Sequence, residues 1–533
     1  MNTKVLLGII FAVALLVRFV GLTSYPVGLT LDEVSIGYNG YAIAETGADE
    51  WGQKFPLAFR SLSDYKPPVS IYLVSLSTAV FGLGEFAVRF PNALLGSLTV
   101  FAFWAMLKRI GFSNKVSIIG AAWVAINPWH VFYSRAGFEA LIALFFVIVG
   151  IWLFLRSVEE KSFSSLILSI VLFCLSVWTY HAERVFVPAL VLALSYLKRR
   201  ELLSLFSKSV GKIAIAGGVI LLFSVPLFYL TFLTPAVSTR ALATSLFRDF
   251  RLPLHNGFYL NYSQFIFDND LFLIARHVLG KYFNYMDVEF LFRNGLSLTP
   301  KSYPGMGLMY AVNLPVFAVG IYSLFFHKSR NLRIIALILF VLGPLPASLT
   351  LDEQHAIRSL TWLPFWGLAF AVGAEKFLSM KIHFKNVLVG IYASLLGINI
   401  VYFGDMYFRQ FPYFYAELWL YGYKQAALIG CAEKENYDEV LITDTFGTEG
   451  PLYTGVPYEY VLFYCNIAPR EFLANNRTIP GFVHRRPDWK KDSKQNMLII
   501  AAPYDLPLDE INKDKVDYIR YPNGRVAFVV VRP

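Results

Sequence analysis

Long apolar segments separated by short polar ones recur along most of this chain. Twelve such segments can be delimited: 5–22, 69–83, 88–107, 114–130, 137–155, 164–179, 184–197, 212–233, 306–326, 332–350, 359–374 and 386–404. A helix of about twenty apolar residues is long enough to cross a hydrocarbon core roughly 30 Å thick. The pattern therefore predicts a polytopic α-helical membrane protein, with a change to soluble character after residue 405.

The segment 69–83 decides how the chain is threaded, because it is short and follows Pro67-Pro68. If it does not cross, the basic clusters of the short loops all lie on the side of Lys4. These clusters are Lys108/Arg109/Lys115, Arg156/Lys161, Lys198/Arg199/Arg200/Lys208, Lys328/Arg330/Arg333 and Lys376/Lys381/Lys385. Basic residues accumulate in cytoplasmic loops. We therefore predict that 69–83 is interfacial or re-entrant in a multi-pass protein of the cytoplasmic (inner) membrane. The chain then has about eleven spans, its N-terminus inside and its C-terminus outside.

The composition supports this class and limits the kinds of partner that are expected. With 56% hydrophobic and 17% aromatic residues, the chain is not an ordinary soluble globule. A net charge of +10 would suggest nucleic acid in a soluble protein. Here the basic residues lie in the short loops between apolar segments, so the expected partner is the lipid bilayer and nucleic-acid binding is not expected.

We predict two domains, a transmembrane domain over 1–405 and a small extracytoplasmic α/β domain over 406–533. In the second, Glu439–Asp444 and Asn496–Ala502 have the composition of strands, and Asn523-Gly524 predicts a hairpin turn. The stretch 411–430 predicts a linking helix. Cys431 and Cys465 could form a disulfide if this domain faces an oxidising space.

The transmembrane domain has two long outer loops, 23–87 and 234–305. The second is rich in aromatic residues and has no spanning segment, so we expect it to lie over the mouth of a cavity. Its function is either that of a substrate lid or that of interfacial padding, and the sequence favours neither.

The predicted topology brings unusual polar residues to one outer face. The candidates in its loops are Asp32, Glu33, Lys66, His130, Tyr133, Arg135, His181, Glu183, Arg184, Asp352, His355 and Arg358. Ionisable groups at membrane depth are costly unless they serve a site, so we predict one outward-facing polar cavity. Each residue also has a purely structural interpretation: the arginines could anchor helix ends, and the histidines could be hydrogen-bonded there. Arg18, inside the first span, either reaches the lipid head groups or points into the cavity.

Several motifs resemble those of a known family. They are Leu31-Asp32-Glu33, Lys66-Pro67-Pro68, residues 84–94 (GEFAVRFPNAL), residues 127–135 (NPWHVFYSR) and residues 355–360 (HAIRSL). Their order and spacing, over roughly residues 5–405, resemble the protein O-mannosyltransferase superfamily (glycosyltransferase family 39-like), which includes the aminoarabinose transferases of lipid A. The resemblance implies a GT-C fold with juxtamembrane helices in the first outer loop. It also implies a polyprenyl-phosphate-linked sugar as donor, and inversion at the anomeric carbon.

The resemblance also implies roles for individual residues. Asp32 matches the family's first-loop aspartate, the expected base, and Glu33 is its neighbour. Lys66 matches a lysine that contacts the lipid phosphate. The family usually has an acidic or polar residue before this lysine, whereas Tyr65 stands there in this chain, so no metal ligand is carried over. No tightly bound cofactor is implied.

The chemistry of the residues fits such a transfer. A base must deprotonate the acceptor hydroxyl, and cations must stabilise the charge that develops on the phosphate. Asp32 can fill the first role. The second falls to Lys66 with one or more of Arg18, Arg135, Arg184 and Arg358.

The sequence therefore predicts a membrane glycosyltransferase of the cell envelope, similar to mannosyltransferases. It would move a hexosyl or pentosyl group from a polyprenyl-phosphate donor to a hydroxyl of a protein, lipid or glycan acceptor. A transporter or flippase of lipid-linked sugars is the alternative. It is disfavoured because the charged residues gather at one face and no inverted repeat is visible. A non-catalytic binding or assembly protein is a third class, which the presence of both Asp32 and Lys66 disfavours.

Overall fold

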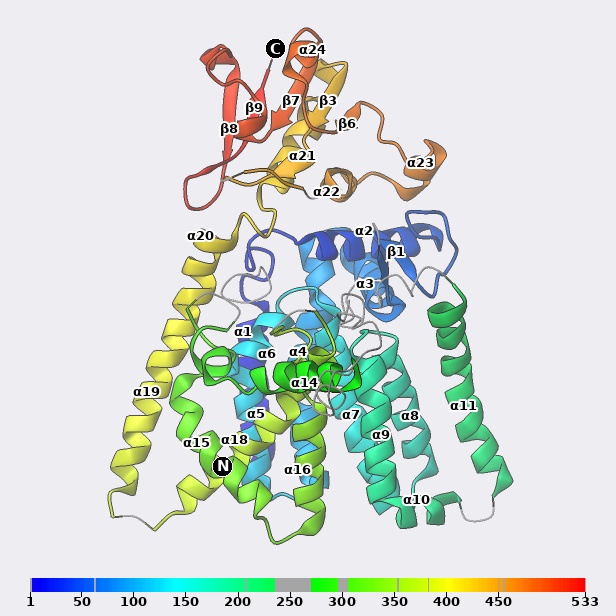
Figure 1. Ribbon diagram of the computed structural model, residues 1–533, viewed down its shortest axis with the longest axis vertical. Helices are drawn as coiled ribbons and strands as arrows, with labels where there is room; N and C mark the ends of the chain where they lie inside the picture. Colours follow the sequence, from blue (N-terminus) through cyan, green and yellow to red (C-terminus); the bar gives the residue numbers. More distant parts are fainter. Residues whose placement is uncertain are drawn as a thin grey trace, which may run out of the picture.

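The computed structural model describes residues 2–61, 64–206, 209–234, 270–295, 305–351, 354–381, 383–448, 450–453 and 456–532. Most of the chain forms helices that stand side by side, and a small sheet lies beyond one end of them (Figure 1). The C-terminus lies in this sheet and the N-terminus near the opposite end. The predicted class, a helical membrane protein with a small C-terminal α/β region, is confirmed in this outline.

Each of the eleven predicted spans overlaps one main helix, although 114–130 also reaches into α6 (Pro128–Ser134) and 332–350 also contains α17 (Leu345–Ser348). The main helices are α1 (Thr3–Phe19), α4 (Glu85–Ile110), α5 (Asn114–Ile126), α7 (Glu139–Glu159), α8 (Phe163–Val177), α9 (Glu183–Leu197), α11 (Val210–Phe228), α15 (Leu314–Phe325), α16 (Arg330–Leu342), α18 (Leu363–Ser379) and α19 (Lys385–Asp405). By length and apolar character, five helical segments of the described chain can cross a membrane, or six if a bent pair counts as one. The other helices are shorter than that criterion requires, so the count of eleven stays a prediction.

The bent pair is α5 followed by α6 (Pro128–Ser134), whose axes differ by 55°. Pro128 cannot continue the hydrogen-bond ladder of α5, and it is well placed at the first position of a new helix. The Asn127 side chain accepts a hydrogen bond from the His130 backbone N–H at 3.0 Å and so caps α6. The chain therefore turns at a residue pair that both ends one helix and starts the next.

The segment between α1 and α4 forms a layer between the bundle and the sheet (Figure 1). It contains α2 (Leu31–Thr46), the antiparallel pair β1 (Phe59–Ser61) and β2 (Asp64–Lys66), and α3 (Pro68–Phe81). Thr30 and Glu33 form a capping box at the start of α2. The apolar helix α3 packs against α2 and α4. At 14 residues α3 is shorter than the helices that can cross a membrane by length and apolar character, and that 69–83 does not span stays a prediction.

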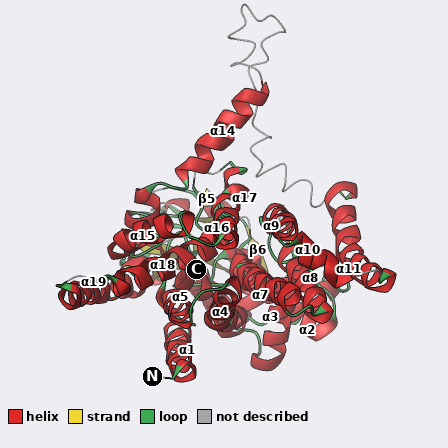
Figure 2. Ribbon diagram, turned by 90° about the horizontal axis from the view of Figure 1, so that it is seen from below, coloured by secondary structure: helices red, strands yellow, loops and turns green. Residues whose placement is uncertain are grey.

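The second long loop is described only from residue 270 to residue 295, so its more N-terminal aromatic residues lie outside the described residues. The helix α14 (Asp270–Asn284) extends away from the helical bundle in the view from below (Figure 2). The Lys281 ammonium donates a hydrogen bond to the Thr350 carbonyl at 2.9 Å, which ties α14 to the end of α17 (Leu345–Ser348).

The C-terminal region is built around a five-stranded mixed sheet with strand order β6-β3-β7-β9-β8. The strands are β3 (Glu439–Ile442), β6 (Phe482–His484), β7 (Met497–Ala501), β8 (Val516–Arg520) and β9 (Val526–Val531). The two predicted strands and the Asn-Gly hairpin are confirmed. The predicted linking helix is interrupted, because α20 (Phe411–Tyr415) ends before α21 (Gly422–Glu433) begins. A disulfide joins Cys431 to Cys465 and so ties α21 to the end of α22 (Pro457–Tyr464).

Candidate active site

Lys66 lies at the junction of β2 and α3, where Pro67 and Pro68 begin the helix. Its ammonium group donates a hydrogen bond to Asp32 Oδ1 at 2.6 Å. The Lys66 side chain is 5% exposed, whereas that of Asp32 is 40% exposed. Two residues separated by 34 positions are thus brought together, and the carboxylate is the partner that faces the more open side.

Glu139, which we did not predict from the sequence, lies on the other side of Lys66. Its Oε1 atom is 4.0 Å from Lys66 Nζ, and its side chain is 12% exposed. It is the first residue of α7. Glu139 could have been found from the sequence, because it is a carboxylate inside the predicted apolar segment 137–155. A charged residue in such a segment is costly unless it has a function.

Glu33, although adjacent to Asp32, belongs to a different set of contacts. Its carboxylate accepts hydrogen bonds from Arg89 Nε at 2.8 Å and from the Gly137 backbone N–H at 2.9 Å. Both side chains of the Glu33–Arg89 pair are fully buried. Arg89 also donates to the carbonyls of Leu22, Pro26 and Gly28. This pair therefore fixes the start of α2 against α4.

Arg18, His130 and Arg135 are fully buried and join α1 to the neighbouring helices α5 and α6. Arg18 donates to the carbonyls of Ala14, Val124 and Ala125, and its Nη2 lies 2.8 Å from His130 Nδ1. Arg135 donates to the carbonyls of Val17, Val20 and Tyr25 and to the Tyr407 hydroxyl. Helix ends leave carbonyl oxygens without intrahelical partners, and these guanidinium groups supply donors to them.

The corner between α8 and α9 approaches the lysine segment. His181 Nε2 lies 3.2 Å from the Tyr65 carbonyl, next to Lys66 in the chain. The Val69 backbone N–H is 3.5 Å from the Trp178 carbonyl. Glu183 is buried at the start of α9, and the half-buried Arg184 follows it. The structure thus brings His181, but not Glu33, next to the backbone that carries Lys66.

An apolar cavity of about 310 Å³ begins at this corner and lies between α8, α9 and α11. Its lining is almost entirely hydrocarbon, with Trp178 and Arg184 among the residues that contribute to it. Because Trp178 also contacts the start of α3, the cavity lies close to the segment that presents Lys66. A cationic residue beside an apolar groove suits an amphiphile that has an anionic head.

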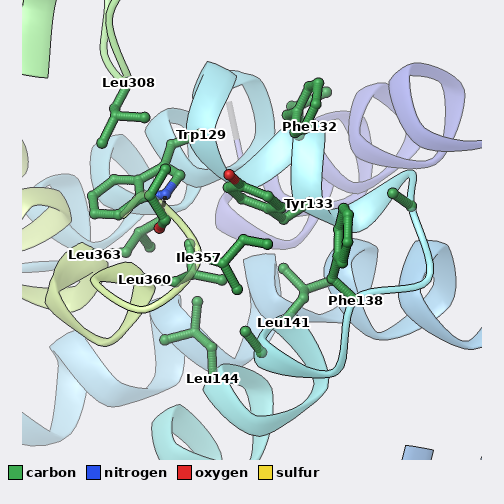
Figure 3. Packing of buried hydrophobic residues seen from close by; sticks show 14 of the residues in the cluster. Trp129, Phe132, Tyr133, Phe138, Leu141, Leu144, Leu308, Ile357, Leu360 and Leu363 are labelled. Atoms are coloured by element: carbon green, nitrogen blue, oxygen red, sulfur yellow. Dashed lines mark hydrogen bonds between the residues drawn. The ribbon is translucent and has the colours of Figure 1, made fainter. Parts of the chain in front are cut away.

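The remaining predicted residues pack around α6. Tyr133 is buried between Phe132 and Phe138, and Trp129 Nε1 donates to the Ala356 carbonyl at 2.9 Å (Figure 3). This bond fixes the segment that carries His355 and Arg358 against α6. Asp352 lies outside the described residues. Among the described residues, no group of three or more His, Cys, Asp or Glu side chains is arranged to hold a metal ion.

The chain is similar to known proteins in part of its sequence and in its whole fold. Residues 65–229 match the family model of dolichyl-phosphate-mannose-protein mannosyltransferases. A polyprenol-phosphate-mannose–protein mannosyltransferase of Corynebacterium glutamicum is 28% identical over 94 residues. That match covers 18% of this chain and only 18% of the relative's length.

Two solved structures share the fold. ArnT from Cupriavidus metallidurans bound to undecaprenyl phosphate is 14% identical, with a TM-score of 0.51 over 98% of this chain and 97% of that chain. The oligosaccharyltransferase of Archaeoglobus fulgidus tethered to an acceptor peptide is 11% identical, with a TM-score of 0.50 over 88% of this chain and 63% of that chain. The family match is confined to residues 65–229, less than half of the chain, whereas the fold similar to that of ArnT extends over 98% of it.

Proposed function

We propose that this protein transfers a sugar from a polyprenyl-phosphate donor to an acceptor hydroxyl at the outer membrane face, with inversion at the anomeric carbon. One observation carries the proposal: Lys66 is held between Asp32 and Glu139 close to an apolar cavity. The cavity suits the isoprenoid chain, and Lys66 suits the phosphate. The relatives support the donor class, since one is named for polyprenol-phosphate-mannose and another binds undecaprenyl phosphate.

The ion pair suggests the order of events. Donor phosphate would take the place of the Asp32 carboxylate on Lys66, which frees the carboxylate to accept the proton of the acceptor hydroxyl. The acceptor oxygen then bonds to the anomeric carbon as the bond from that carbon to the phosphate oxygen breaks. Polyprenyl phosphate leaves with the electron pair, and Lys66 stabilises its charge. A single displacement of this kind inverts the anomeric configuration.

The other predicted residues receive narrower roles in this proposal. Arg184 lines the apolar cavity and is the arginine best placed to assist at the phosphate. We assign Glu33, Arg18 and Arg135 a structural role in supporting α1 and α2, because their side chains already form hydrogen bonds with other groups of the protein. Glu139 is a second carboxylate that orients Lys66 and is the alternative base. The acceptor class, whether protein, lipid or glycan, is not assigned.

Transfer is tested with purified protein in detergent, a polyprenyl-phosphate sugar and candidate acceptors. Detergent solution has no compartments, so a transporter or flippase would form no product there. A glycosylated acceptor together with released polyprenyl phosphate is the expected result. The absence of product with every acceptor class, while lipid binding is retained, would favour the transporter.

The role of Lys66 gives a prediction about donor affinity. Lys66→Met keeps much of the side-chain length but removes the charge, so donor binding should weaken. The loss of a charge-assisted contact costs roughly 1.5–3 kcal/mol, which corresponds to about ten- to a hundredfold. Binding of undecaprenyl phosphate to the purified variant measures this directly. Lys54→Met is the matched control, since Lys54 is an exposed lysine of the same loop; equal donor affinity in wild type and Lys66→Met would remove Lys66 from the site.

We further propose eleven membrane crossings, with residues 406–533 outside as a separate domain from 1–405. The helix ends with basic clusters lie toward the end of the bundle that holds the N-terminus (Figure 1). The disulfide between Cys431 and Cys465 suits an oxidising compartment.

Single cysteines report this topology in a Cys174→Ser background, where the disulfide leaves no other thiol. Cysteine at the exposed position Thr478 should react with a membrane-impermeant maleimide added to intact cells. Cysteine at Ser113 or Ser329, both exposed at the opposite end, should react only after the membrane is opened. Labelling of Ser113→Cys in intact cells would mean that α3 crosses the membrane.

A further inference from the structure

The C-terminal region is docked directly on the helix that carries Asp32. α22 packs against α2 (Figure 1), and a Cβ atom at Gly37 of α2 would lie 2.6 Å from a ring carbon of Phe463. The Tyr460 hydroxyl donates to the Leu29 carbonyl at 3.0 Å, just before the capping box of α2. The Tyr464 hydroxyl donates to Glu85 Oε1 at 2.9 Å. The contacts of Tyr460 and Phe463 hold the N-terminal half of α2, and that of Tyr464 ties α22 to α4, so the position of Asp32 depends on α22.

The same helix carries an acidic residue that the proposed mechanism does not use. Glu459 is fully buried and forms no ion pair among the described residues, and Ser35 of α2 is the hydroxyl that acts on its carboxyl group. The charged groups that act on it are Glu50, Lys66 and Asp32. On the neighbouring α21, Lys424 is already paired with Glu85 at 2.9 Å. Glu459 is therefore a buried acid without a paired cation among the described residues, and it lies within electrostatic range of the proposed phosphate-binding lysine.

We propose that Glu459 is a positioning residue of the transfer site, which the C-terminal region supplies, and that its buried carboxyl group keeps Lys66 available to the donor phosphate. This inference rests on the proposed function. In its neutral form the carboxyl group does not attract the Lys66 ammonium group, which can then pair with Asp32 or with the donor phosphate. In its ionised form it would attract Lys66 and repel the phosphate.

The protonation state follows from the surroundings. Burial, and next the charge of Glu50, raise the pKa of Glu459 well above its ordinary value. Burial likewise raises the pKa of Glu50, which accepts a hydrogen bond from Asn39 Nδ2 at 3.1 Å. A carboxyl group with a raised pKa is neutral below that pKa and becomes charged as the pH rises through it. Donor affinity should therefore fall on the alkaline side, where Glu459 acquires its charge.

The test compares donor affinity at pH 6.5 and pH 9 in the full-length protein, with undecaprenyl phosphate as the probe. In the wild type, binding should be weaker at pH 9 than at pH 6.5, by up to about tenfold, because a coupling of one pKa unit between two groups corresponds to a tenfold change in affinity. Glu459→Gln keeps the shape of the side chain but cannot ionise, so its affinity should change less than about twofold over the same range. Glu471→Gln, at an exposed position of the same region, should follow the wild type.

Three outcomes would contradict this inference. If the wild type and Glu459→Gln show the same pH profile, Glu459 does not act on the donor. If the thermal midpoint shows that Glu459→Gln is unfolded, Glu459→Asp takes its place in the test. Glu459→Asp retains an ionisable group, so its donor affinity must depend on pH as in the wild type. A folded Glu459→Asp variant whose donor affinity does not change with pH overturns the proposal. A wild type that does not bind the lipid at either pH would overturn the proposed function itself, and this inference with it.

Discussion

Replacing Asp32 by Asn is expected to lower the rate of sugar transfer about 10²- to 10⁴-fold, the usual cost of losing a general base. The amide keeps the size of the side chain but cannot accept the proton of the acceptor hydroxyl. Donor affinity should be unchanged or higher, because the carboxylate that bonds to Lys66 at 2.6 Å no longer competes with the phosphate. Transfer kinetics and lipid binding, measured side by side, separate the two effects.

Glu45→Gln is the matched control for Asp32→Asn, since Glu45 is an exposed carboxylate on the same helix. It should transfer sugar at the wild-type rate. If Asp32→Asn also does so, Asp32 is not the base, and Glu139→Gln becomes the variant to test. If Asp32→Asn fails to bind the donor, Asp32 holds the site together rather than catalysing the reaction.

Replacing Arg89 by Met is expected to destabilise the fold by about 3–5 kcal/mol, because it leaves the buried carboxylate of Glu33 without its cation. Three backbone carbonyls would lose their donor in the same variant. The measurement is the thermal midpoint of the purified protein, followed by tryptophan fluorescence.

The control for this change is Arg109→Met, which removes a partly exposed pair with Glu159. Pairs of this kind contribute about 0–1 kcal/mol, so its midpoint should stay near that of the wild type. The double variant Glu33→Gln/Arg89→Met removes both charges and should recover part of the lost stability. A midpoint for Arg89→Met equal to that of Arg109→Met would mean that the Glu33–Arg89 pair does not support the fold.

Asp32 and Glu33 are neighbours in the chain but point in different directions, which is why Asp32→Asn is expected to affect catalysis and the loss of the Glu33–Arg89 pair to affect stability. Adjacent residues on a helix point in directions about 100° apart. One carboxylate therefore faces Lys66, and the other faces Arg89 in the interior. The sequence alone presents an acidic pair and does not say which member meets which cation.

The local sequence pattern predicted the membrane class, the approximate positions of most helices and most strands of the C-terminal sheet. It could do so because an apolar run of membrane length, a proline pair and an Asn-Gly turn each act locally. It also supplied Asp32 and Lys66, through motifs whose order resembles that of the family. It is the tertiary structure that places Glu139 beside Lys66, Arg18 on carbonyls at the end of α5, and Arg135 on carbonyls at the end of α1. It likewise brought Glu459 from the C-terminal region to α2.

These partners are separated by tens to hundreds of residues along the chain, and an arginine near a helix end looks the same in sequence whether it binds a ligand or a buried carbonyl. Side-chain direction and long-range packing decide between them, because a buried charge must be paired and the fold determines which groups are close enough to pair with it.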